Sequence, residues 1–399
     1  MVGMRDVAKA AGVSLSTVSL VVNSTGYVSA YMRERVEDAM RRLDYVPNEL
    51  ARNFYHDRTG LIGVIVPTIV HPFFSMLTAA LQHALAGRGY RTLVCSQADS
   101  ETGEAEYVDM LQRHMMDGIV MAAHTSHAPG YWTSIGRPIV AFDRYLGEGI
   151  PSIGSDHVQG GRLIAEQLMR TGARHVVCIG GPRSQFHDLM VSAPSGGSGN
   201  CAGSYTKALN TTFPTIRYYL TLEHELNRAR IRHDYVEVGE VYDLQRYPRI
   251  AHEIFEHLGD VDAIVGSDVS AAYCIQEALR LGVRIPGQLQ VIAYDDSYLA
   301  EAAGMRITAV RQDFMTLAQL TSERIITEIR RGAQAQTATE AENMAAAGTD
   351  TTNTDDATDT DVGAAASPCD SAAGALDPET RPLDKLVPVQ LRVGETTRS

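Results

Sequence analysis

Acidic and histidine side chains that could perform catalysis are present, but their spacing fits no catalytic or metal-binding motif. Asp295 and Asp296 follow an apolar run and are the best candidates for a carboxylate pair. Successive residues of a strand face opposite sides, so we do not expect these two to share a substrate. His124 and His127 lack companion ligands at a spacing that suits a metal ion. The chain has no Gly-x-Ser-x-Gly elbow, Walker loop or His-Glu-x-x-His motif, so we expect no enzyme, no metal site and no cofactor.

Three polar residues, Asp295 among them, come directly after apolar, strand-like runs. They are Asp143, Ser267 and Asp295. Parallel α/β sheets bind ligands at the carboxyl ends of their strands, and a carboxylate there can accept hydrogen bonds from hydroxyl groups. Each of the three could instead be a capping or loop residue.

The elements that must position these residues alternate from Leu61 onward. Residues 61–67 form a continuous apolar run, as expected of a buried parallel strand, and residues 72–87 follow with helical spacing and a glycine stop. Repeated βα units predict an α/β fold with doubly wound parallel sheets. The further strand-like runs are 92–95, 118–123, 138–142, 175–180, 263–266 and 289–294, and the further helical patterns include 103–114, 160–171 and 270–282.

The first sixty residues have a different pattern, with short helices and no strand. Residues 6–11 predict a helix that Gly12 can end in a left-handed turn, and Ser14 is a candidate N-cap for residues 15–23. The offsets between Ala8, Gly12 and Val18 are typical of a helix-turn-helix, whose second helix enters the DNA major groove. An ordinary helical hairpin is the alternative.

Length and cysteine usage indicate a multidomain protein of a reducing compartment. The chain has 399 residues, enough for two or three domains. Its five cysteines are scattered singly, which argues against a disulfide scaffold and a zinc ribbon and favours the cytosol. We expect neither a signal peptide nor a transmembrane helix.

The net charge of −13 is mostly local. Residues 333–380 carry ten acidic residues and no lysine or arginine. This Ala-, Thr- and Asp-rich segment cannot bury enough apolar surface to order itself, so we expect a disordered insertion over residues 333–385. Residues 386–393 then predict a last strand. The acidity does not exclude a nucleic-acid partner for the rest of the chain.

A series of short motifs runs along the chain in a fixed order. They are Arg5–Ser14, Ser16–Ser19, Val28-Ser29, Arg33–Val36, Leu43–Asn48, Ala51-Arg52, Arg58–Val64, His71–Phe74, Ala293–Asp296 and Ile307–Gln312. In this order they resemble the lac-repressor (LacI/GalR) family of bacterial transcription regulators, over about residues 4–332 and 386–397. The resemblance implies an N-terminal helix-turn-helix DNA-binding domain (1–47), a hinge helix and linker (48–60), and a two-lobed, periplasmic-binding-protein-like effector-binding and dimerisation domain (61–332 with 386–397).

The resemblance also implies which residues contact DNA. Side chains that can donate to phosphates are Ser14, Thr17, Ser19 and Asn23, whereas Leu15, Ser16 and Leu20 fall where the family reads base edges. The family usually has arginine at the position of Leu20, so a bidentate guanine contact is missing here. Residues 1–60 carry eight basic and seven acidic residues, so the motif and not a basic patch supports DNA binding.

Residues 48–56 look like the family's hinge helix, which forms when two subunits sit on DNA. Asn48, Ala51 and Arg52 match its motif, and Phe54 falls at the position of a minor-groove wedge. Phe54 could instead pack the helix against its partner. A helix this short is marginal alone, which suits a coupling element.

The two lobes of such proteins hold an effector between them, here a sugar or sugar phosphate. The expected contacts are Phe73, which can stack on a sugar ring, then Asp143, Ser267 and Asp295, and more weakly Tyr242. The family often has an arginine near residue 201, where this chain has Cys201, and that departure puts the effector's identity in doubt.

The sequence therefore predicts a cytoplasmic DNA-binding repressor of carbohydrate genes. It would bind double-stranded operator DNA as a homodimer, with no membrane partner. Two alternatives are a regulator controlled by a protein co-effector and a sugar-binding module whose DNA-binding head has decayed. A hydrolase is a more distant third.

Overall fold

The computed structural model of the chain describes residues 2–23, 26–46, 58–99, 102–125, 127–128, 130–187, 211–257, 259–347 and 385–399. The chain divides into two compact units, one of residues 1–60 with 113–117 and one of residues 61–112 with 118–399. Each unit is described by itself.

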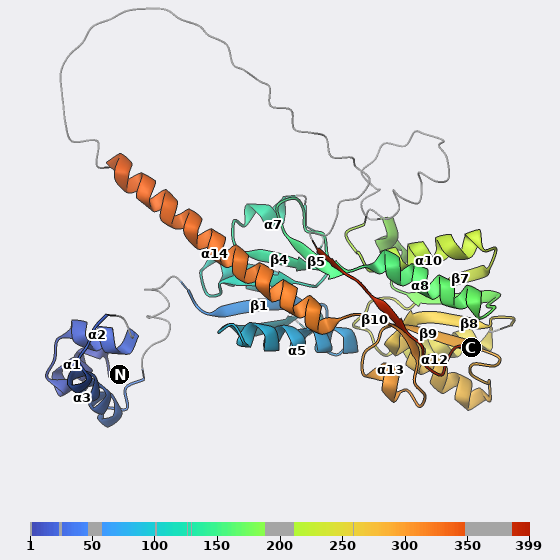
Figure 1. The fold of residues 1–399 in the computed structure, drawn as a ribbon, viewed down its shortest axis with the longest axis horizontal. Helices are drawn as coiled ribbons and strands as arrows, with labels where there is room; N and C mark the ends of the chain where they lie inside the picture. The colour runs from blue at the N-terminus through green and yellow to red at the C-terminus, as the bar shows by residue number, and fades with distance from the viewer. Residues whose placement is uncertain are drawn as a thin grey trace, which may run out of the picture. The chain divides into compact units, whose positions relative to one another are not determined.

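The first unit contains three helices, α1 (Met4–Ala11), α2 (Leu15–Asn23) and α3 (Ala30–Arg42). They enclose a small apolar core in which Val7, Val18 and Val36 are fully buried (Figure 1). Gly12 ends α1 at φ 64°, and a Cβ there would meet the Arg35 guanidinium at 2.7 Å. The tight glycine turn expected between the first two helices is therefore confirmed.

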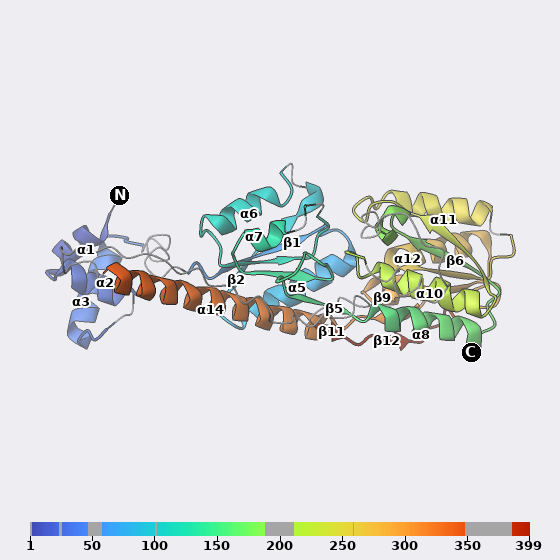
Figure 2. The same cartoon turned by 90° about the horizontal axis from the view of Figure 1, so that it is seen from above.

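The second unit holds two α/β lobes, each built on a sheet of six strands (Figures 1 and 2). The first sheet has the order β11-β5-β4-β3-β1-β2 and is entirely parallel. Its strands are β1 (Leu61–Val66), β2 (Arg91–Ser96), β3 (Gly118–Met121), β4 (Ile139–Phe142), β5 (Ser152–Ser155) and β11 (Lys385–Val387). The helical elements of this part of the chain are α5 (Pro72–Ala86), η1 (Gln97–Asp99), α6 (Ala105–Gln112) and α7 (Tyr131–Ser134).

The second sheet repeats this order as β12-β10-β9-β8-β6-β7. Its strands are β6 (His175–Gly180), β7 (Arg232–Glu237), β8 (Ala263–Ser267), β9 (Gln290–Asp295), β10 (Thr308–Arg311) and β12 (Gln390–Arg392), of which only β12 is antiparallel. The accompanying helical elements are α8 (His157–Arg170), η2 (Arg183–His187), α10 (Ile216–Arg228), α11 (Arg246–Glu256), α12 (Asp268–Leu281) and α13 (Leu299–Ala302). The predicted doubly wound α/β architecture is confirmed twice over.

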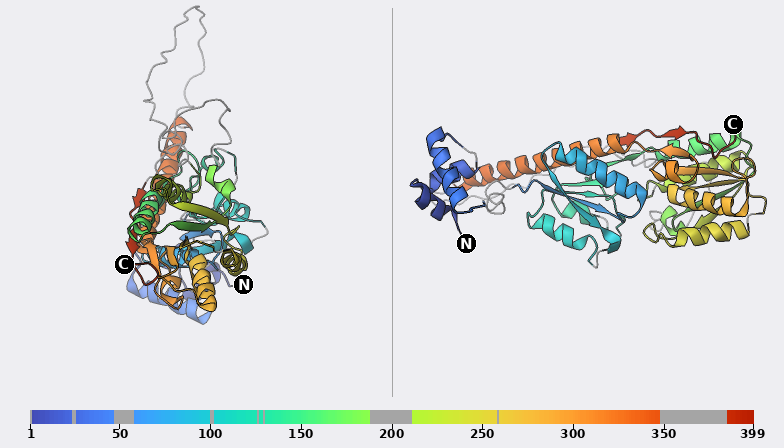
Figure 3. Two further views of the ribbon diagram at one scale, coloured as in Figure 1. Left: turned by 90° about the vertical axis from the view of Figure 1, so that its right-hand side faces the viewer. Right: turned by 90° about the horizontal axis from the view of Figure 1, so that it is seen from below.

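The chain crosses between the lobes three times, from β5 to α8, from β10 to the long helix α14 (Phe314–Ala347), and from β11 to β12 (Figure 3). The first turns of α14 pack on α5 in the first lobe, where Leu317, Ile325 and Ile329 are buried. The carboxyl ends of both sets of parallel strands thus face a shared region at the crossovers.

Two expectations for the carboxyl-terminal part are wrong. The predicted last strand over 386–393 is two short strands, one in each sheet, because Pro388 has no N–H to continue a ladder. The insertion expected to be disordered from residue 333 begins inside α14, which continues through Ala347 because residues 333–347 hold seven alanines and neither glycine nor proline. Residues 348–384 lie outside the described part.

Candidate functional site

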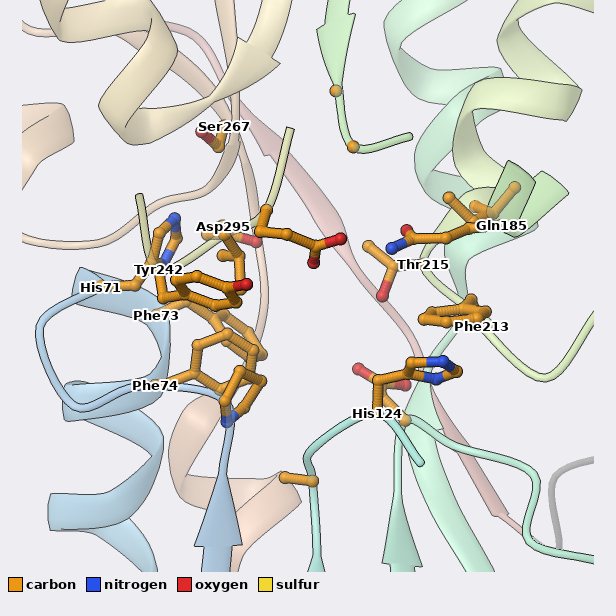
Figure 4. Close-up of a pocket in the computed structure, with 18 of the residues that line it drawn as sticks. His71, Phe73, Phe74, His124, Gln185, Phe213, Thr215, Tyr242, Ser267 and Asp295 are labelled. Carbon is orange, nitrogen blue, oxygen red and sulfur yellow. The ribbon is translucent and has the colours of Figure 1, made fainter. Parts of the chain in front are cut away.

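A cavity of about 720 Å³ lies between the two lobes at the carboxyl ends of their strands. All five residues that the sequence marked as ligand contacts line it, and Figure 4 shows Phe73, Tyr242, Ser267 and Asp295 around it. The fifth is Asp143. The predicted residues that directly follow strands thus lie at the cavity. The hydrogen bonds and the exposure of each predicted residue show which of its atoms a ligand could reach.

Asp143 directly follows β4 and is held in the left-handed region at φ 44°. Its Oδ1 accepts a hydrogen bond from the backbone N–H of Ser155 at 3.1 Å, and Nε2 of His157 lies 3.1 Å from the same oxygen. His157 in turn contacts the Tyr294 hydroxyl through Nδ1 at 2.8 Å. One carboxylate oxygen of Asp143 is thus engaged with the crossover.

Asp295 ends β9, the counterpart of β4 in the second lobe, at φ 115°. Its Oδ1 accepts a hydrogen bond from Nε2 of Gln312 at 2.7 Å. Burial, and then the nearby Asp268 carboxylate, raise the pKa of Asp295 well above its usual value. Burial likewise raises the pKa of Asp268 to about 7. A protonated carboxyl in this position can donate to a ligand oxygen as well as accept.

Asp296 faces away from the cavity, as the strand alternation predicts. Its carboxylate pairs with the Arg392 guanidinium of β12, with Nε 2.9 Å from Oδ1. The two consecutive aspartates therefore have separate roles, one in the cavity and one in fastening the last strand.

Ser267 lines the cavity but also caps a helix. Its Oγ accepts a hydrogen bond from the backbone N–H of Ser270 at 3.3 Å, which makes it the N-cap of α12. The neighbouring Asp268 accepts a hydrogen bond from the backbone N–H of Ser297. Here the capping interpretation of Ser267 is confirmed, and its part in ligand binding stays a prediction.

The two aromatic candidates, Phe73 and Tyr242, differ in how much of the side chain is exposed. Phe73 is 8% exposed and its ring packs against Phe74, Phe142 and Phe314, with centroids 5.1, 6.3 and 5.4 Å away. Tyr242, in the segment between β7 and α11, is 51% exposed. Phe73 thus offers a fixed face and Tyr242 a side chain that can close over a ring.

Sequence reasoning missed several residues of the cavity wall. His71 is the N-cap residue of α5, is buried, and has no hydrogen-bond partner on either ring nitrogen. Burial lowers its pKa to about 4, so it is neutral at pH 7. Gln312 and Phe213 were also missed, although Gln312 lies in a motif that carried the family resemblance. These residues could not be recognised from the sequence, because each lies in a different crossover or loop and only the tertiary structure brings them to the cavity.

The second helix of the first unit has the geometry expected of a DNA-reading helix. Ser14 caps α2, because its Oγ accepts a hydrogen bond from the backbone N–H of Thr17 at 3.1 Å. Leu15 is 42% exposed and Ser16 is exposed, whereas Ser19 and Leu20 are half-buried. Ser14, Leu15 and Ser16 thus stand at the free amino end of α2, the end that enters a major groove in such motifs.

Two polar side chains of α2 are tied to their own helix. The Asn23 amide donates to Oγ of Ser19 at 3.1 Å, and the Thr17 hydroxyl lies 2.9 Å from Oγ of Ser14. These bonds hold the side chains in place along one stretch of the helix. Asn48, Ala51, Arg52 and Phe54 of the expected hinge helix lie outside the described residues.

Known proteins match both units. Residues 3–48 match "Bacterial regulatory proteins, lacI family", residues 59–191 match "Periplasmic binding proteins and sugar binding domain of LacI family", and residues 165–346 match "Periplasmic binding protein-like domain". A sucrose operon repressor of Pediococcus pentosaceus is 32% identical over 317 residues, which cover 79% of this chain and 89% of the relative. The chain belongs to the lacI family of bacterial regulatory proteins.

Two further proteins match over most of the chain at lower sequence identity. A ribose operon repressor of Halalkalibacterium halodurans is 28% identical, over 83% of this chain and 91% of the relative. The crystal structure of the lac repressor dimer bound to operator and the anti-inducer ONPF is 20% identical and superposes with a TM-score of 0.68, over 100% of this chain and 99% of that one. That likeness shows the shared fold.

As a lacI-family member the chain is a DNA-binding transcription regulator and not an enzyme. Across the described ranges, no group of three or more histidine, cysteine, aspartate or glutamate side chains is arranged to hold a metal ion. Within the same ranges, no helix is long and apolar enough to cross a membrane.

Proposed function

We propose that this protein is a homodimeric repressor that binds a pseudo-palindromic operator in the cytoplasm and responds to a sugar in the cavity between its lobes. The observation that carries the proposal is the coexistence of an N-capped, amino-end-exposed α2 with a cavity lined by strand-end carboxyls and aromatic rings. The sucrose and ribose operon repressors among its relatives support a carbohydrate-responsive role.

DNA recognition would use two copies of α2 on two half-sites. Ser14, Thr17, Ser19 and Asn23 would contact phosphates, and Leu15, Ser16 and Leu20 would meet base edges. With leucine in place of the family's usual arginine, apolar contact with a thymine methyl group replaces a guanine contact. The operator should therefore differ from the half-site that most relatives read.

Control would pass from the cavity to the DNA through the hinge. A ligand bound with different affinity in two lobe arrangements shifts the balance between them. Asn48, Ala51 and Arg52 would form the hinge helix, and Phe54 would wedge into the minor groove at the operator centre. A Phe54→Ala variant should then lose operator affinity while keeping its sugar affinity.

The proposal is tested by selecting genomic DNA fragments with the purified full chain, at a stated salt concentration. Enrichment of a pseudo-palindrome, and its release or gain when neutral sugars are added, would support the proposal. A folded dimer that enriches no sequence with or without sugar would contradict it and would favour a sugar-binding module with a decayed head. Enrichment that only a phosphocarrier protein alters would favour a protein co-effector.

A further inference from the structure

The size and lining of the cavity indicate the chemical class of its ligand, given the proposed sugar-responsive function. The cavity volume of about 720 Å³ lies in the upper half of the range typical of small-molecule pockets, about 300–1,000 Å³. A single sugar ring would leave much of this space to water. The cavity therefore has room for a second sugar ring.

Two aromatic surfaces stand on opposite sides of the cavity (Figure 4). On one side lie Phe73 and Tyr242, together with His71. On the other lies the His124 ring, which packs against Phe213 with centroids 4.2 Å apart and the two planes tilted by 33°. Each pair combines one ring from each lobe, because Phe73 and His124 follow strands of the first sheet, whereas Tyr242 and Phe213 belong to the second lobe. The cavity thus offers two faces on which a sugar ring can stack.

Hydrogen-bonding groups accompany both faces. His71 stands beside Phe73, is 3% exposed, and has both ring nitrogens unpartnered. A buried polar group without a partner is costly, and a ligand hydroxyl would supply the partner. On the opposite side, Gln185 and Thr215 point into the cavity beside Phe213 (Figure 4).

The charge of the lining disfavours an anionic ligand. Among its described residues are four carboxyl side chains, those of Glu104, Asp143, Glu240 and Asp295, and the only lysine or arginine is Arg144. Arg144 donates a hydrogen bond to the Asp143 carbonyl at 2.6 Å and lies over the Phe213 ring at 5.3 Å, and its buried Nε has no hydrogen-bond partner. Among the described lining residues, a phosphate would meet the carboxylates of Glu104, Asp143 and Glu240 and only this one buried guanidinium.

We propose that the cavity takes an uncharged ligand of two sugar rings, one on the Phe73 and Tyr242 face and one on the His124 face, with a hydroxyl of the first ring bound to His71. It predicts weaker binding of the sugar phosphates that a sugar-responsive regulator could otherwise recognise. It also assigns roles to His71 and His124 that differ from one another.

Calorimetric titration of the full chain tests the ligand class. The probes are sucrose, trehalose, maltose and cellobiose, their component glucose and fructose, ribose, and sucrose 6-phosphate. At least one neutral disaccharide should bind ten times or more tightly than every monosaccharide, and sucrose 6-phosphate should bind at least tenfold more weakly than sucrose. A monosaccharide or sucrose 6-phosphate that binds as tightly as the best disaccharide, or no binding by any of the four disaccharides, would overturn the proposal.

Substitutions test the two faces separately. His124→Ala should weaken the disaccharide about tenfold and leave a bound monosaccharide unchanged, because it removes only the second face. His71→Leu should weaken both ligands. His252→Ala is the matched control, because this exposed histidine of α11 pairs with Glu277 and does not line the cavity. Equal loss for both ligands in His124→Ala would refute the second site.

Operator binding of the wild-type chain, measured in parallel, separates this inference from the proposed function. Disaccharide binding without sequence-specific DNA binding would contradict the repressor and leave the two-ring site standing. Operator binding with no affinity for the four disaccharides would contradict the two-ring site and leave the repressor standing.

Discussion

The hydroxyl of Ser155 donates a buried hydrogen bond of 2.6 Å to Oε1 of Gln312, although the two residues are 157 positions apart in the chain. Ser155 stands at the first crossover between the lobes and Gln312 at the second. Ser155 also donates its N–H to Asp143, and Gln312 donates its amide to Asp295. A continuous set of hydrogen bonds therefore joins the two strand-end carboxyls of the cavity through both crossovers.

This connection predicts that Ser155→Ala affects both stability and response. The substitution leaves Oε1 of Gln312 buried without a donor, which should lower the free energy of unfolding by about 1–3 kcal/mol. Because the lost bond joins the crossovers, the sugar concentration needed for half-maximal change in operator binding should also shift. Urea unfolding and a dose curve measure the two effects.

The control is Ser134→Ala, at an exposed serine of α7. It should change neither quantity. A Ser155→Ala protein with wild-type stability would show that the bond between the crossovers contributes nothing.

Position 295 should accept asparagine with less loss of stability and function than alanine. Its raised pKa means that the folded state favours the neutral carboxyl, whereas the unfolded chain ionises above a pH of about 3.8. The aspartate therefore costs stability as pH rises above that value, and the stability of Asp295→Asn relative to wild type should increase between pH 3.5 and pH 7. Thermal unfolding at both pH values measures this.

Asp295→Ala, by contrast, should impair the sugar response, because it removes the acceptor for Gln312 and for a ligand hydroxyl. A wild-type dose curve for the alanine variant would exclude Asp295 from the ligand site.

His71 should make the protein less stable in acid. Its pKa is about 4 in the folded state and 6.5 when unfolded, so the unfolded chain binds the extra proton between these values. The contribution is fully present above pH 6.5 and falls by about 3 kcal/mol as the pH drops to 4. Asp268 and Asp295 act in the opposite sense, so the difference between wild type and His71→Gln must be measured.

That difference in unfolding free energy should be constant above pH 6.5 and shift by this amount in favour of the glutamine variant at pH 4. A pH-independent difference would mean that the pKa of His71 is the same in the folded and unfolded states.

Leu20→Arg should change which operator is read. Arginine there can bind a guanine in the major groove, which is worth about 1–3 kcal/mol of discrimination per half-site. Selection from a random DNA library should show a new guanine preference at one position of each half-site. Thermal stability serves as the control for folding, and an unchanged sequence preference would place residue 20 away from the bases.

The sequence by itself determined the local elements and the order in which they occur. The turn at Gly12 and the cap at Ser14 depend on neighbours a few residues away, and the apolar runs of β1, β6 and β9 indicate burial without any knowledge of partners. For the same reason Asp143, Ser267 and Asp295 could be assigned to a ligand site, because the position after a buried parallel strand is a local property with a general consequence.

Tertiary structure decided which of these residues are free for a ligand and what stands beside them. The partners of Asp295 and Ser155 come from the second crossover, and the ring against which His124 packs comes from the other lobe. His71 could not be recognised in the sequence, because its importance lies in being buried without a hydrogen-bond partner. The single strand expected after residue 385 became two because Pro388 interrupts the ladder where the chain passes from one sheet to the other. These relations join residues far apart in the chain, so only folding brings them together.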